Sequence, residues 1–65
     1  MISSISGKVT TKTNNSIVVE VGGIGVLLQV PSRVATGIVI GNLVNFHTYL
    51  IVREDALTLY GFTEI

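Results

Sequence analysis

The chain has 65 residues, enough for one small domain with a single core, which argues against a two-lobed enzyme with a cleft between its lobes. Its formal net charge is zero, from four Lys or Arg and four Asp or Glu, so it lacks the cations that strong independent binding to duplex DNA requires. It contains no cysteine, which excludes disulfides and Cys-ligated metals.

Residues with β-branched side chains dominate the composition, with ten Val, eight Ile and seven Thr against only two Ala. This balance favours strands over helices and predicts an all-β domain. Because 48% of the residues are hydrophobic and only 12% are charged, we expect some apolar surface to meet a partner. The apolar runs are far shorter than the roughly 20 residues of a membrane helix, and we expect a cytoplasmic protein.

Three strands are predicted in the first half of the chain. Residues 2–11 alternate, with Ile5, Gly7 and Val9 on one face, and residues 17–21 form a second strand after a polar turn at 13–16. Two consecutive glycines, Gly22 and Gly23, predict a two-residue hairpin turn into a third strand at 24–30, which Pro31 ends.

The second half of the chain begins with a longer connection. Residues 32–42 have no strict period, and we expect a loop with one helical turn started by Ser32. Strands are predicted at 43–52 and 57–62, and the charged residues between them predict a second hairpin.

Five strands with a longer connection between the third and the fourth are typical of a five-stranded Greek-key OB-fold barrel, and an SH3-like barrel is the alternative. We expect one domain over residues 1–65. The period-two alternation predicts which side chains contribute to the barrel interior. They are Ile5, Val9, Val19, Val21, Val26, Leu28 and Phe46.

No pattern in the sequence indicates catalysis, a cofactor or a metal site. His47, the only histidine, lies mid-strand without a recognisable catalytic partner, and we interpret it as structural or surface-exposed. The glycines at 22, 23 and 25 join two strands and are not followed by a Gly-Lys-Ser/Thr triplet, so they serve backbone geometry instead of phosphate binding.

The one charged cluster lies between the last two strands, where Arg53, Glu54 and Asp55 are consecutive. Their spacing alone favours a solvated turn, because acidic side chains prefer water. A functional interpretation needs further support.

That support comes from a resemblance to the first domain of the RuvA family. Residues 52–62 read VREDALTLYGF and resemble the stretch that ends that domain, and shorter matches occur in the same order: MI at 1–2, GK at 7–8, EVGGIG at 20–25, VP at 30–31 and TYL at 48–50. The similarity spans almost the whole chain. The chain departs from the commoner family pattern in its few Lys and Arg and in Val26, where an aromatic residue is frequent.

The resemblance implies a non-catalytic domain that binds four-way (Holliday) junction DNA and works in recombination and repair as a subunit of a branch-migration complex. RuvA proteins form homotetramers that hold the junction open while a ring ATPase drives migration. Glu54 and Asp55 match the family's acidic pin, whose carboxylates repel phosphates at the crossover. Arg53 contacts a phosphate or pairs with a neighbouring carboxylate.

The family also has a helix-hairpin-helix domain and a motor-binding domain, and neither is present here, so we expect this chain to be an excised domain. Apolar residues on both faces near 50–52 and at 57 and 59 predict a contact that closes the four-fold ring. Two alternatives stay open: a generic OB module for single-stranded DNA, and a purely structural oligomerisation barrel.

Overall fold

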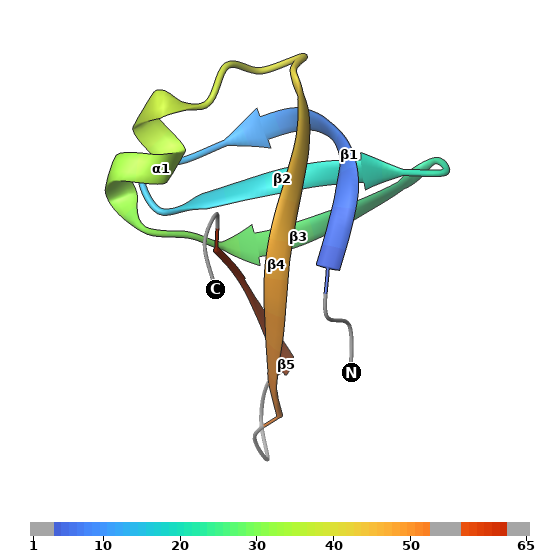
Figure 1. Cartoon of the computed structure of the whole chain (residues 1–65), viewed down its shortest axis with the longest axis vertical. Helices are drawn as coiled ribbons and strands as arrows, with labels where there is room; N and C mark the ends of the chain where they lie inside the picture. Colours follow the sequence, from blue (N-terminus) through green and yellow to red (C-terminus); the bar gives the residue numbers. More distant parts are fainter. Residues whose placement is uncertain (1–3, 53–56, 63–65) are drawn as a thin grey trace.

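The computed structural model describes residues 4–52 and 57–62 and shows a closed barrel of five strands (Figure 1). The elements in chain order are β1 (Ser4–Lys12), β2 (Ser16–Val21), β3 (Ile24–Gln29), α1 (Ser32–Gly37), β4 (Leu43–Val52) and β5 (Leu57–Phe62). The strands follow the order β1-β2-β3-β5-β4 around the barrel, and β4 pairs with β1 to close it. The predicted all-β, OB-type barrel is therefore confirmed.

The turn between β2 and β3 forms as the two glycines predict. Val21 pairs with Ile24 across it, and Gly22 and Gly23 have φ angles of 58° and 87°. Two successive positive φ angles match a turn whose twist suits the flanking strands, and glycine adopts them without steric cost.

Strand β1 curves so that it serves two neighbours. Its first half pairs with β4, from Ser4 with His47 to Lys8 with Leu43. Its second half pairs with β2, from Lys8 with Glu20 to Lys12 with Ile17, and the register shifts between Val9 and Thr11. Gly7 of β1 lies close to β2, where a side chain would collide with the backbone carbonyl of Glu20. Only glycine fits this close approach of two strands.

The barrel closes between β3 and β5 through one parallel pair, Gln29 with Tyr60. Gly61, next along β5, faces the barrel interior, where an added Cβ would lie 3.1 Å from Leu28 Cδ1 and 3.4 Å from Val30 Cγ1. Strand β3 itself spans Ile24–Gln29, although the Val30 N–H still donates to the carbonyl of Asn15 at 3.0 Å, in the register of the β2–β3 pairing. The strand therefore ends one residue earlier than the sequence predicts.

Eight hydrophobic residues form the core: Val9, Ile17, Val19, Leu28, Val30, Ala35, Phe46 and Leu59. Four of the seven predicted interior residues are among them, and Ile5 and Val26 are half-buried against them. The prediction is wrong for Val21, which is 39% exposed. Val21 lies at the end of β2, one residue past Glu20, which is the last residue of β2 that pairs with β1. On that side no described strand covers Val21.

A short helix forms in the long connection, where the sequence predicts a loop with one helical turn started by Ser32. It spans Ser32–Gly37 after Pro31, and its Ala35 is fully buried against the barrel. The Lys12 ammonium donates to the carbonyl of Ile38 at 2.6 Å and ties the chain after the helix to β1. No helix among the described residues is long and apolar enough to cross a membrane.

Candidate DNA-junction interface

The β4–β5 hairpin extends away from the barrel and carries the candidate site (Figure 1). The two strands pair over six positions, from His47 with Phe62 to Val52 with Leu57. The pairing of β1 with β4 reaches only His47, so among the described residues the outer half of β4 pairs with β5 alone. We call residues 50–52 and 57–59 the hairpin stem.

The predicted site residues Arg53, Glu54 and Asp55 lie outside the described residues. Their anchors are described, because Val52 pairs with Leu57 and four residues join these two positions. The predicted second hairpin is confirmed, but the geometry of the acidic pair stays a prediction.

The stem exposes Val52, as the sequence predicts, but the prediction of a contact surface is wrong for Leu59, which lies in the core. Val52 is 68% exposed, Leu50 and Ile51 are half-buried, and Leu59 is buried. A shallow hollow of about 290 Å³ lies between the stem and β3, lined by Leu27, Gln29, Leu50, Thr58 and Leu59. Exposed apolar side chains at the end of a paired stem are available for an intermolecular contact.

The outward face of the same hairpin carries four ring-bearing side chains in two cross-strand pairs. His47 lies opposite Phe62, and Tyr49 lies opposite Tyr60. Tyr49 is 52% exposed, Phe62 is 43% exposed and Tyr60 is half-buried. Of the four Phe and Tyr residues, Phe46, Tyr49, Tyr60 and Phe62, only Phe46 lies in the core.

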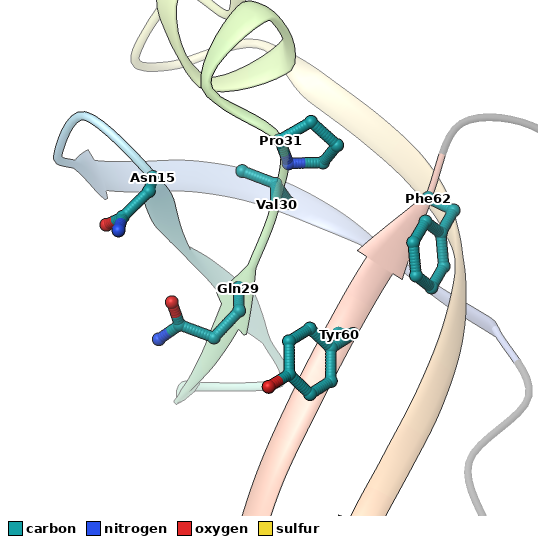
Figure 2. A pocket seen from close by; sticks show the side chains of 6 residues that line it. All are labelled: Asn15, Gln29, Val30, Pro31, Tyr60 and Phe62. Atoms are coloured by element: carbon teal, nitrogen blue, oxygen red, sulfur yellow. The ribbon is translucent and has the colours of Figure 1, made fainter.

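A second hollow, of about 310 Å³, lies where β5 ends (Figure 2). Its lining residues are Asn15, Gln29, Val30, Pro31, Tyr60 and Phe62. Figure 2 shows the carboxamides of Asn15 and Gln29 on one side and the rings of Tyr60 and Phe62 on the other. The sequence did not indicate this hollow, because its lining comes from three separate segments.

Positive charge is sparse over the described residues. The cations there are Lys8, Lys12 and Arg33, and the Lys12 ammonium is engaged with a backbone carbonyl. Lys8 and Arg33 are exposed, but they lie on β1 and α1 instead of on the hairpin. This distribution offers few contacts for DNA phosphates.

The remaining sequence candidates occupy structural positions. His47 is exposed on β4, and no group of three His, Cys, Asp or Glu side chains that could hold a metal occurs among residues 4–52 and 57–62. Gly22 and Gly23 form the β2–β3 turn, which confirms their role in backbone geometry.

Comparison with known proteins decides the family. The model of the RuvA N terminal domain matches residues 1–61 of the chain. The chain belongs to the RuvA N-terminal domain family. This assignment confirms the resemblance of the VREDALTLYGF stretch and places it in a match over nearly the whole chain.

Curated relatives agree with the RuvA family model. The chain is 52% identical over 65 residues to a protein of Acidothermus cellulolyticus and 48% identical over 65 residues to one of Chloroflexus aggregans, in each case over 98% of this chain. A protein of Roseiflexus sp. is 46% identical over the whole chain. All three are named Holliday junction branch migration complex subunit RuvA, and the chain spans about a third of their length.

Proposed function

We propose that this RuvA domain is a non-catalytic Holliday-junction-binding and assembly module of a branch-migration complex, acting in recombination and repair. The observation that carries the proposal is the match to RuvA relatives over 98% of the chain, which includes the acidic sequence between the two paired strands of the hairpin. A rigid paired stem suits the presentation of a short charged loop to DNA.

Glu54 and Asp55 act in this proposal as an acidic pin at the crossover. In a homotetramer, two carboxylates from each subunit surround the point where four DNA strands exchange. Even with a Debye length of about 8 Å at physiological salt, carboxylates close to phosphates repel them. The pair therefore disfavours the close approach of phosphates and helps to keep the exchanging strands apart.

The apolar stem supplies the assembly contact. Exposed Val52 and half-buried Leu50 and Ile51 provide apolar area on both faces of the stem, which suits a heterologous contact. Such contacts form a closed ring when the rotation that relates neighbouring subunits returns to the first subunit. The ring ATPase of the complex engages a part of RuvA proteins other than this domain. Alone, the domain is a monomer or associates weakly.

Arg53 has two candidate roles, a contact with a DNA phosphate or a pair with a neighbouring carboxylate. The two roles differ in their dependence on DNA. Replacement of Arg53 by Gln weakens junction binding and lowers its salt dependence only if the guanidinium contacts a phosphate.

The proposal is tested in a chimera in which this chain replaces the matching third of the Acidothermus cellulolyticus relative. Glu54→Gln combined with Asp55→Asn should leave folding and tetramer formation intact, tighten junction binding or relax its preference over duplex, and change the rate of branch migration. Val39→Ala, an exposed change far from the stem in sequence, is the matched control. Unchanged junction preference and migration rate in the double variant contradict the pin.

One observation favours a second candidate function, a module for single-stranded DNA. The exposed rings of Tyr49 and Phe62 are of the kind on which bases stack. Such modules also need a basic groove, and none of the described residues on β4 or β5 is Lys or Arg. Titration of the 65-residue chain with a thymidine oligonucleotide at low salt separates the two, because the junction module should bind it very weakly.

A further inference from the structure

The hollow at the end of β5 has an apolar floor and a neutral polar rim. Val30 is only 6% exposed at its base, Pro31 and the rings of Tyr60 and Phe62 form its walls, and the carboxamides of Asn15 and Gln29 stand at its edge (Figure 2). None of the six lining residues is charged. At about 310 Å³, the hollow is large enough for a bulky side chain.

This chemistry fits a polypeptide better than a nucleic acid. An apolar floor takes up an apolar side chain, and carboxamides at the rim can donate to and accept from the backbone on either side of it. A nucleic-acid strand brings phosphates, which need nearby cations. The cations among the described residues lie on β1 and α1, and none of them lines the hollow.

The surroundings of the hollow also resemble a protein interface. Tyr60 and Phe62, which line it, continue into the outward face of the hairpin through their cross-strand partners Tyr49 and His47. Clustered aromatic side chains without charge are typical of the buried centre of protein–protein and interdomain contacts.

The position of the hollow identifies its occupant. Phe62 is both the last residue of β5 and part of the wall of the hollow, so any polypeptide that follows this domain starts beside the hollow. The family model describes an N-terminal domain, and the chain spans only about a third of its curated relatives. Most of the length of the RuvA relatives therefore lies outside the matching N-terminal domain, and the hollow lies where the following polypeptide would start.

We infer that the hollow binds an apolar side chain from the polypeptide that follows this domain in RuvA proteins, and so fixes the next part of the protein against the barrel. The inference rests on membership of the family and on the geometry of the hollow. It does not depend on the proposed acidic pin, since the docking needs no DNA.

The test compares backbone amide exchange in the 65-residue chain and in the Acidothermus chimera, both without DNA. The amides of Val30 and Phe62 should exchange about tenfold more slowly in the chimera, because a docked side chain restricts opening at the hollow. Equal exchange rates in the two proteins overturn the inference.

Two variants locate the effect. Asn15→Trp places a bulky ring at the rim and should abolish the added protection in the chimera, while the Val30–Asn15 hydrogen bond uses only the backbone carbonyl. Phe62→Ala removes part of the wall and should reduce the protection, and Leu43→Ala, at a side chain that is 83% exposed outside the hollow, should retain it. Full protection in Asn15→Trp contradicts the inference.

Two further measurements separate this inference from the proposed function. The Glu54→Gln, Asp55→Asn chimera should keep the full protection even if its junction binding changes, and loss of protection there contradicts independent docking. A thymidine oligonucleotide added to the 65-residue chain should leave the chemical shifts of Gln29 and Phe62 unchanged. A shift at both residues at micromolar oligonucleotide instead identifies the hollow as a nucleic-acid site.

Discussion

The barrel beside α1 and the stem of the β4–β5 hairpin both carry apolar residues at alternate positions, but they bury them differently. In the barrel, Val9, Ile17 and Val19 have no exposed surface, because other strands and the helix cover the interior. In the stem, Val52 is 68% exposed, although it continues the alternation of Phe46 and Leu50. Period-two alternation therefore reports which side chains share a face, and only the topology decides whether that face is covered.

This difference assigns separate roles to the two regions. The barrel gains stability from burial in its own core, to which Leu59 of the stem also belongs, whereas the exposed end of the stem at Val52 adds little to folding and leaves apolar surface for a partner. Substitutions of buried core residues should therefore change the free energy of unfolding, and substitutions at the exposed end of the stem should change association.

The largest effect is expected for Phe46→Ala in the barrel core. Phe46 is 2% exposed, and truncation of a buried Phe costs about 3–5 kcal/mol. That cost matches the whole stability of many domains of this size, so the variant should be largely unfolded at 25 °C. Urea unfolding followed by circular dichroism measures the change, with Val52→Ser as the stem control within about 0.5 kcal/mol of the parent. Equal losses of unfolding free energy in the two variants would contradict the different roles assigned to the barrel core and the end of the stem.

A smaller loss is expected for Gly7→Ala, where β1 approaches β2 closely. The new Cβ collides with the carbonyl of Glu20 and lies 2.9 Å from Val19 Cγ1, so two strands must separate. We expect a loss of about 2 kcal/mol, in the upper range for single substitutions.

Thermal unfolding measures this loss. The matched control is Gly37→Ala, because an added Cβ there meets nothing within 4 Å and the φ angle is not in the left-handed region. Gly37→Ala should be neutral or slightly stabilising. A Gly7→Ala variant as stable as the parent shows that β1 and β2 can move apart without cost.

The stem is tested by association. In the Acidothermus chimera, Val52→Ser should weaken tetramer formation about tenfold, equivalent to about 1.4 kcal/mol, because it removes exposed apolar surface from the proposed contact. Sedimentation over a concentration series measures it. Ile24→Ala, which is also strongly exposed but lies at the β2–β3 turn, is the control, and equal weakening by both variants contradicts a contact specific to the stem.

The smallest effect distinguishes two lysines. Lys12→Met removes the hydrogen bond from its ammonium to the Ile38 carbonyl and should cost about 1 kcal/mol of unfolding free energy. Lys8→Met, at an exposed position of the same strand, should cost less than about 0.5 kcal/mol. Chemical denaturation of the two variants in parallel measures the difference, and equal effects show that the Lys12 contact adds no stability.

The sequence predicts most of the fold because its signals are local. Alternation locates the five strands, and Gly22 and Gly23 fix one turn by their φ angles. The exposure of Val21 is not local, since it depends on where the partner strand β1 diverges. The Lys12 contact with Ile38 spans 26 positions and has no sequence signal of its own.

The candidate site is less predictable from physical reasoning alone. The acidic stretch gains a function only from its resemblance to RuvA, because a turn between strands attracts charged residues without any function. The cross-strand pairs of ring-bearing side chains on the hairpin could have been predicted from the sequence. Once four residues are assigned to the loop, the hairpin register places Tyr49 opposite Tyr60 and His47 opposite Phe62.

The acidic pin is tested most directly by the ratio of junction to duplex affinity across a salt series, measured for the chimera and for its Glu54→Gln, Asp55→Asn variant. If the two carboxylates repel phosphates at the crossover, the variant should differ most from the parent at low salt, and the difference should shrink as screening increases. Identical ratios for the two proteins at every salt concentration would contradict the pin and leave residues 53–56 as a solvated turn.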